Sequence, residues 1–146
     1  MTNIDELMEM WSKDCKIDET AIDSELIRIP ILHSRYLNIM THNSMICKRL
    51  SFTYAEKKNF KHEYYDGHYN NPDDLQKYNI EPFVKKVYKT DMARTLEADK
   101  ELNEILMKKA IHQEIVDFCE AVLKELHSRT FQLRSLIDYR KYMRGE

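Results

Sequence analysis

The chain has 146 residues, 33% of them charged, and a formal net charge of -2. This length suits one domain with its own core, and the near-zero net charge excludes a general polycation that coats nucleic acid. Only two glycines and three prolines occur, among many Leu, Ile, Glu and Lys residues, so the composition predicts an all-α fold.

The sequence carries no sign of a membrane or secreted protein. No apolar run approaches the roughly 20 residues of a membrane span, and the acidic N-terminus has no signal-peptide core. The three cysteines, Cys15, Cys47 and Cys119, lie far apart without paired spacing. We therefore expect a soluble, cytoplasmic protein without a disulfide framework, and we expect Cys119 to be a small hydrophobe.

Apolar spacing predicts a first helix over residues 4–14, in which Leu7 and Trp11 share a face. Residues 17–27 are predicted to be irregular or briefly helical. Proline is tolerated in the first turn of a helix, so a long helix is expected from Pro30 to Tyr65, with a possible weak point at 41–44. In this helix Phe52 and Tyr54 are predicted to be core residues.

The second half begins with a polar segment, 66–81, which is predicted to be a mobile loop. Residues 82–89 are ambiguous between a strand and an extended segment. Thr90 or Asp91 is expected to cap a short helix through Leu96. Asp99 is expected to cap a long helix, with a possible break at 128–130 before a last amphipathic helix. The predicted organisation is one domain with N-terminal helices (1–65), a linker (66–89) and C-terminal oligomerisation helices (90–146).

The stretch 48–65 interleaves cations with aromatic residues. Its five cations face only two acids, Glu56 and Glu63. Cations neutralise phosphates, and aromatic faces stack on unpaired bases, so this pattern suits single-stranded nucleic acid; a solvated lysine face is the alternative. The predicted nucleic-acid-binding residues are Lys48, Arg49, Lys57, Lys58, Lys61, Tyr64 and Tyr65. Whether the two tyrosines stack on bases or pack in the core is left open.

Signals of catalysis are absent from the sequence. No phosphate-binding glycine loop, metal-ligand spacing or paired nucleophile and base occurs. The expectation is a binding protein without enzymatic activity, metal or cofactor. A helical adaptor or scaffold without DNA binding is the main alternative, and a small nuclease is a third.

Several segments in order along the chain resemble the UvsY-like recombination mediators of T-even-like phages and their marine relatives. The resemblance extends from about Ile4 to Met143. It is carried by Ile29-Pro30-x-Leu32-His33-x-x-Tyr36, Tyr64-Tyr65-Asp66-Gly67, Pro82-Phe83, Asp99-Lys100-Glu101-Leu102, Asp117-Phe118-Cys119, Ser128-Arg129-Thr130-Phe131-Gln132-Leu133 and Ile137-x-Tyr139-Arg140. Two departures are Asn59, where some relatives have a base, and Thr130, where relatives often have glycine.

The resemblance implies a largely helical protein that binds single-stranded DNA in phage recombination and repair within the infected cell. The implied partners are a RecA-like recombinase, a single-stranded-DNA-binding protein and further copies of the chain, in a ring-like hexamer or heptamer. The C-terminal helices are implied in assembly. The predicted oligomerisation residues are Leu102, Leu106, Ile115, Phe118, Val122, Leu126, Leu133 and Ile137.

Overall fold

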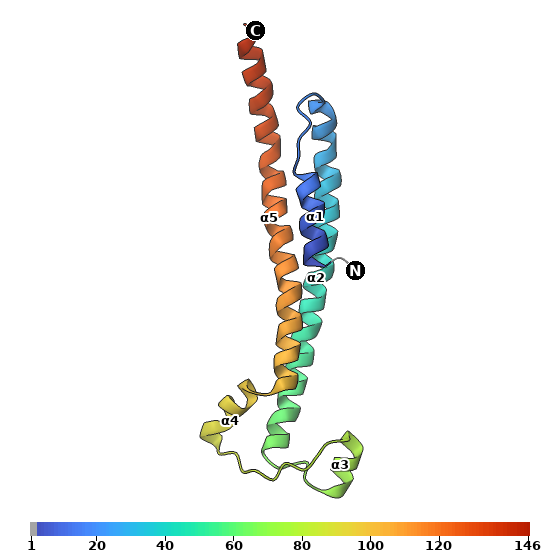
Figure 1. Cartoon of the computed structure of the whole chain (residues 1–146), viewed down its shortest axis with the longest axis vertical. Coiled ribbons are helices and arrows are strands. Elements are labelled where there is room, and N and C mark those ends of the chain that lie inside the picture. Colours follow the sequence, from blue (N-terminus) through green and yellow to red (C-terminus); the bar gives the residue numbers. More distant parts are fainter. Residues whose placement is uncertain (1–2) are drawn as a thin grey trace. The chain divides into compact units, whose positions relative to one another are not determined.

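A computed structural model describes residues 3–146, and five helices account for all the regular structure in that range (Figure 1). They are α1 (Ile4–Asp14), α2 (Ile22–Tyr65), α3 (Pro72–Tyr78), α4 (Lys89–Glu97) and α5 (Lys100–Met143). The predicted all-α class is confirmed. None of the described helices is long and apolar enough to cross a membrane.

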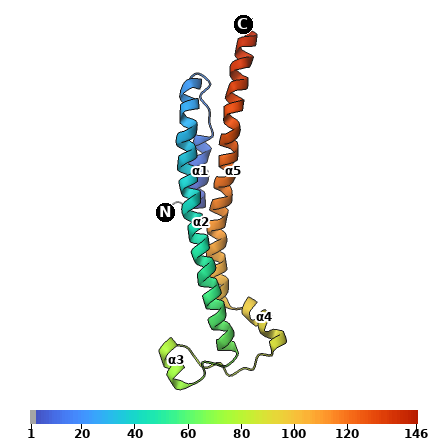
Figure 2. The same ribbon diagram turned by 180° about the vertical axis from the view of Figure 1, so that it is seen from behind.

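The chain divides into two compact units. Unit 1 comprises residues 3–46 with Ile111–Glu146, and unit 2 comprises Cys47–Ala110. In unit 1, α1 lies beside the first half of α2 and the middle of α5 in both views (Figures 1 and 2). In unit 2, α3 and α4 lie on opposite sides of the end of α2 (Figures 1 and 2).

The first helix has the predicted bounds. Its start is fixed by a capping box, in which the Asn3 side chain accepts a hydrogen bond from the Glu6 amide at 2.9 Å and Glu6 accepts one from the Asn3 amide at 3.4 Å. These two bonds satisfy backbone N–H groups that a helix start leaves without intrahelical partners. Local sequence was therefore sufficient to place α1.

The second helix is longer than predicted. It begins at Ile22, so Pro30 lies in its interior and not in its first turn. A proline removes the hydrogen bond to the carbonyl four residues earlier. Here Pro30 and Leu26 are both exposed, so water can hydrate that carbonyl. The helix also continues through 41–44, where the buried Asn43 bonds the Ile39 carbonyl at 2.8 Å and the His112 ring at 2.8 Å.

Part of the predicted loop is helical. Asn71 caps α3 by accepting a hydrogen bond from the Asp74 amide at 2.8 Å, and Pro72 occupies the first turn. An Asn-Pro pair followed by two aspartates is a helix-start signal, so this helix begins within a segment whose composition is typical of a loop. Residues 80–88 have no regular structure, which confirms the extended alternative. The short helix α4 begins before Thr90, and Tyr88 occupies its cap position without a side-chain capping bond.

The last helix begins as predicted and continues as a single element. The Asp99 carboxylate accepts a hydrogen bond from the Leu102 amide at 3.0 Å. The possible break at 128–130 does not occur. Arg129 is buried inside unit 1 and Thr130 is exposed. A threonine, unlike a glycine, favours this continuity.

Each unit has its own apolar core. Unit 1 buries Leu7, Leu32, Tyr36, Ile115, Cys119, Val122 and Leu126. Unit 2 buries Met92, Leu96 and Leu102, against which Tyr54, Tyr65 and Val87 pack. Trp11 contacts Tyr36 edge to face, with the ring centroids 5.6 Å apart.

Most of the predicted oligomerisation residues serve these cores. Leu102, Ile115, Val122, Leu126 and Leu133 are at most 3% exposed. Their side chains are already covered within one chain, so the wide apolar arc of α5 does not by itself mark a subunit interface. Phe118 and Ile137 are half-buried, and Leu106 is 41% exposed, so only these three of the eight retain surface for another subunit.

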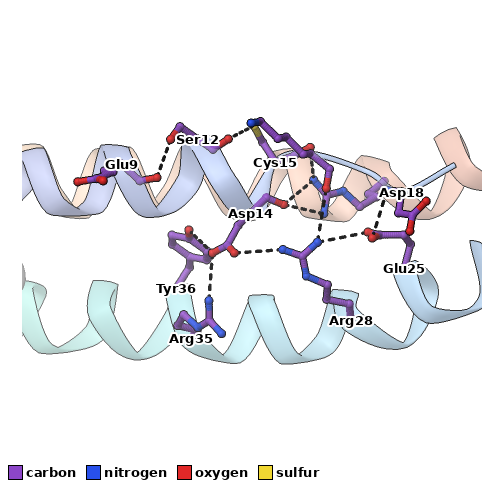
Figure 3. A network of polar contacts seen from close by, with 11 residues as sticks. Glu9, Ser12, Asp14, Cys15, Asp18, Glu25, Arg28, Arg35 and Tyr36 are labelled. Atoms are coloured by element: carbon purple, nitrogen blue, oxygen red, sulfur yellow. Dashed lines mark hydrogen bonds and ion pairs between the residues drawn. The ribbon is translucent and has the colours of Figure 1, made fainter. Parts of the chain in front are cut away.

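A polar network joins the helices of unit 1 around Asp14 (Figure 3). Its carboxylate accepts hydrogen bonds from Arg28 at 3.1 Å, Arg35 at 3.1 Å and Tyr36 at 2.8 Å. The Arg129 guanidinium donates to the Asp14 and Cys15 carbonyls at 3.1–3.4 Å and lies 5.6 Å from the Trp11 ring centroid. The C-terminal end of α1 is thus tied to both α2 and α5.

Candidate nucleic-acid interface

The part of α2 in unit 2 carries all seven predicted nucleic-acid-binding residues. Helical periodicity distributes them over different sides of the helix. At 100° per residue, Tyr54, Lys61 and Tyr65 lie on one side of the helix and Lys48, Arg49 and Phe52 lie on the other. The first side packs against α4 and the start of α5 through the buried cluster. We call Lys48, Arg49 and Phe52 the outer face of α2.

Two of the predicted cations form ion pairs with α5 and the residue before it. Lys57 lies 2.8 Å from Glu101, and Lys61 lies 3.3 Å from Asp99 and 3.5 Å from Glu101. The Lys61 side chain is only 13% exposed. These two charges are compensated inside unit 2, so they contribute less positive potential to a ligand than their number suggests.

The acidic partners are held in their ionised form. Burial alone would raise the pKa of Asp99, but hydrogen bonds from Tyr65 and the Leu102 amide, with the Lys61 charge, outweigh it and lower the pKa. A hydrogen bond from Lys57 lowers the pKa of Glu101, and the charge of Lys61 adds to this effect. The two carboxylates are therefore ionised at neutral pH.

Tyr64 and Tyr65 pack within unit 2. Tyr65 donates a hydrogen bond to Asp99, and its ring centroid lies 4.9 Å from that of Phe83. Tyr64 donates to the Glu81 carbonyl at 2.9 Å and lies 5.5 Å from Phe83. Both rings close the end of α2 against residues 81–83. Burial, followed by the bond to Asp99, raises the pKa of Tyr65.

The remaining predicted cations are open to solvent. Lys48, Arg49 and Lys58 are exposed, and none of them has an ion pair within residues 3–146. The Lys58 ammonium lies 5.8 Å from the centre of the Tyr54 ring. Phe52, predicted to be core, is 72% exposed, and that prediction was wrong. Phe52 follows Arg49 by three residues and Lys48 by four, so it lies on the same side of the helix as these exposed cations. This spacing indicates that Phe52 is exposed.

An aromatic cluster lies where α3 meets α2. Phe60 stacks on Tyr69 with centroids 4.9 Å apart, and Tyr78 meets both rings edge to face. A hydrogen bond to Glu63 raises the pKa of Tyr69 to about 12. An open cavity of about 390 Å³ adjoins this cluster. Its lining consists of Thr53, Glu56, Lys57, Phe60, Tyr78 and Ile80.

Groups of His, Cys, Asp and Glu side chains are the ones that hold metal ions in proteins. No group of three or more His, Cys, Asp or Glu side chains in residues 3–146 is arranged to hold a metal ion. Cys119 is fully buried, and burial raises the pKa of its thiol to about 11, which confirms its interpretation as a small hydrophobe.

Comparison with known proteins identifies relatives that span almost the whole chain. Residues 10–146 match the family described as recombination, repair and ssDNA binding protein UvsY. The recombination protein UvsY of Enterobacteria phage T4 is 27% identical over 146 residues, covering 98% of both chains.

Two crystal structures of the T4 recombination mediator protein UvsY share this fold. The lattice type II structure has a TM-score of 0.86 at 23% identity and covers 99% of this chain and 100% of its own. The lattice type I structure has a TM-score of 0.83 at 23% identity and covers 94% and 98%. Together with the family match, these results establish that the chain belongs to the UvsY family of recombination, repair and ssDNA binding proteins.

Proposed function

We propose that this protein is a recombination mediator, which binds single-stranded DNA and loads a RecA-like recombinase onto DNA coated by a single-stranded-DNA-binding protein. It acts in phage recombination and repair in the cytoplasm of the infected cell, without catalysing a reaction. The observation that carries the proposal is the outer face of α2, where two cations without an ion pair in residues 3–146 lie beside an exposed aromatic ring.

The outer face fits a single strand better than a duplex. Lys48 and Arg49 supply phosphate contacts, and Lys58 adds a third exposed cation on the Tyr54 side of the same helix. The Phe52 ring is free to stack on a base, and stacking is worth roughly 1–3 kcal/mol per base. A duplex keeps its base faces covered, so only its phosphates would be bound.

The other predicted binding residues take a supporting role in this proposal. Lys57 and Lys61 hold the end of α2 to α5 through Asp99 and Glu101, and Tyr64 and Tyr65 pack that end against Phe83. They keep the outer face in place without contacting DNA in this conformation.

Assembly would strengthen a weak site. Three cations per subunit give a modest affinity, and a ring of identical subunits, in the hexamer or heptamer range, multiplies it through effective concentration. Unit 1 offers apolar side chains for such assembly that are between 56% and 77% exposed in the free chain: Ile27, Ile31, Phe131, Tyr139, Tyr142 and Met143.

The test is binding of a fluorescent single strand and a matched duplex across a salt series, with native mass recorded. We expect Lys48→Ala with Arg49→Ala and Lys58→Ala to weaken single-strand binding about tenfold and to reduce its salt dependence, because fewer counterions are released. The charge-matched control is Lys16→Ala with Arg134→Ala and Lys141→Ala in unit 1.

Two results would contradict the proposal. If the triple variant and the wild type bind the single strand equally, the outer face is not part of the binding site. An oligomer that ignores DNA at low salt would favour the adaptor alternative. Cleavage of the strand in the presence of a divalent metal ion would show an enzyme.

A further inference from the structure

A second basic and aromatic segment lies in unit 2, apart from α2. Residues 82–94 contain four cations, Lys85, Lys86, Lys89 and Arg94, against the single acid Asp91. The segment comprises the irregular stretch before α4 and the first turns of that helix. Its excess of positive charge equals that of residues 48–65, in a chain whose net charge is negative.

Three of the four cations of this segment have no ion pair among the described residues. Lys85, Lys86 and Lys89 are exposed and form no ion pair with any residue in the range 3–146. Arg94 lies 3.3 Å from Asp91, but their side chains are 81% and 43% exposed, and such surface pairs contribute little energy. Lys57 and Lys61, by contrast, are already paired with Asp99 and Glu101.

The cations border a small cavity. Its volume is about 190 Å³, and it is lined by Phe83, Lys85, Lys86, Val87, Asp91, Arg94 and Thr95. A cavity of this size has room for a group equivalent to several water molecules. Three positive side chains around it favour an anion, and only one carboxylate opposes them.

An exposed ring stands next to the cavity. Tyr88 is 62% exposed, and the Lys86 ammonium lies 5.5 Å from the centre of its ring. The neighbouring Val84 is 93% exposed. A cation that neutralises a phosphate beside a ring that can stack on a base is the combination found where proteins bind single strands.

The segment packs on the side of α2 that carries Tyr54 and Lys58, opposite the outer face. Val87 and Tyr54 pack against the same buried cluster of Met92, Leu96 and Leu102. Lys58 lies beside Tyr54, one helical turn further along α2. α3 lies on the other side of the end of α2 and does not intervene (Figures 1 and 2).

We propose that the cavity bordered by Lys85, Lys86 and Arg94, with Lys89 and Tyr88 beside it, is a second phosphodiester-binding site for single-stranded nucleic acid. It extends the contact of each subunit beyond the outer face of α2. This inference rests on the proposed function, because it assigns a further part of the same strand's path. The exposed ring favours a nucleic-acid strand over an acidic peptide, which would need only the charges.

The experiment compares a loop variant, Lys85→Ala with Lys86→Ala and Lys89→Ala, against the wild type by fluorescence anisotropy of labelled oligo(dT) across a salt series. All three side chains are exposed, so the fold should be unaffected, and a thermal melt checks this. We expect about tenfold weaker binding and a shallower salt dependence, by about 0.7 in the logarithmic slope for each phosphate that is no longer neutralised. Tyr88→Ala should weaken binding several-fold with an unchanged slope, because it removes stacking and no charge.

The controls separate this site from the outer face and from general charge. If the wild type and the control variant of Lys16, Arg134 and Lys141 bind equally while the loop variant binds more weakly, the site is supported. Unchanged binding by the loop variant, with weaker binding by the α2 variant, overturns this inference and leaves the proposed function intact. Equally weak binding by the loop and control variants also overturns it, since net charge alone would explain the effect.

Two further outcomes concern the ligand. Weaker binding of the loop variant to a labelled poly-glutamate peptide, with oligo(dT) binding unchanged, overturns the inference and reassigns the site to an acidic protein. A wild type that binds no single strand overturns both proposals.

Discussion

Asp99 is the residue on which three helices of unit 2 converge. Its carboxylate caps α5 through the Leu102 amide, accepts a hydrogen bond from Tyr65 of α2, and lies 3.3 Å from Lys61. It stands one residue after the C-cap of α4. The residue is 5% exposed, so its charge depends on these partners and not on water.

The loss of stability on replacing Asp99 should therefore depend on pH. Because the folded state lowers its pKa, Asp99 contributes stability that is complete above the unfolded-state pKa of about 3.9 and is lost as the pH falls through the folded value. Asp99→Asn keeps a capping side chain but removes the charge, so we expect a loss of about 2 kcal/mol at pH 7. Denaturant unfolding from pH 7 to pH 3 should show the gap between variant and wild type closing.

The matched control is Asp91→Asn, which removes a carboxylate from an exposed pair with Arg94. It should change stability by less than about 0.5 kcal/mol at any pH. A gap for Asp99→Asn that stays constant from pH 7 to pH 3 would show that the charge of Asp99 contributes nothing.

Phe52 has no packing role in the free chain, because 72% of it is exposed. Phe52→Ala should leave the free energy of unfolding within about 0.5 kcal/mol of the wild type. If the ring stacks on a base, single-strand binding should weaken by about fivefold or more, with duplex binding unchanged. Fluorescence anisotropy with both ligands measures this. If Phe52→Ala instead lowers the oligomeric mass and leaves the affinity unchanged, the Phe52 side chain belongs to a subunit contact.

At the scale of elements, both polar and apolar contacts hold α1 against α2 and α5. Leu7 and Trp11 pack on unit 1, but the end of the helix is held through Asp14 and Arg129. Both residues are buried, and the Asp14 carboxylate has three donors around it. Removing Asp14 leaves the buried Tyr36 hydroxyl without its acceptor, and an unpaired buried donor costs more than the bond itself contributes.

Asp14→Ala should release α1 before it affects the rest of the fold. We expect a loss of about 3 kcal/mol, because Arg28, Arg35 and Tyr36 are left without their common acceptor. Hydrogen exchange should show the protection of the amides in residues 4–14 falling by about 100-fold, since exchange reports local opening. Glu9→Ala, which breaks only an exposed pair with Lys13 at 3.6 Å, should have little effect. Retained protection in Asp14→Ala would mean that the apolar contacts suffice.

At the scale of the whole molecule, self-association would use surface that the cores leave uncovered. Phe131, Tyr139 and Tyr142 fall on one side of α5, and each is more than 60% exposed. Contiguous exposed apolar surface of this kind often marks a protein interface. The buried Leu126 and Leu133 stand close by in the sequence but face the core.

Charged substitutions on that side should dissociate an oligomer without unfolding the chain. We expect Phe131→Glu with Tyr142→Glu to shift the native mass toward smaller species and to leave helix content unchanged. The control, Thr130→Glu with Lys141→Gln, changes charge by the same amount on the same turns of α5, outside the apolar stripe, and should keep the wild-type mass. An unchanged mass in the first variant would place the subunit contacts elsewhere.

The sequence alone determined the features that depend on neighbouring residues. Composition determined the all-α class, and Asp99 marked the start of α5 because a capping side chain bonds an amide only three residues away. The first helix was placed for the same reason. The basic and aromatic character of 48–65 was equally visible, since it requires only a count of side chains.

Tertiary structure decided which of those side chains are available. Helical periodicity defines the faces of a helix but not what covers each face. The sequence therefore predicts Phe52 in the core and Lys57 and Lys61 on the surface. In the structure Phe52 is 72% exposed, and Asp99 and Glu101, far later in the chain, pair with the two lysines, of which Lys61 is only 13% exposed. The position of Pro30 in the helix was likewise predicted wrongly. The free-energy cost of an interior proline depends on whether water reaches the Leu26 carbonyl, and only the folded structure decides that. Long-range partners determine burial and charge compensation, and no local pattern encodes them.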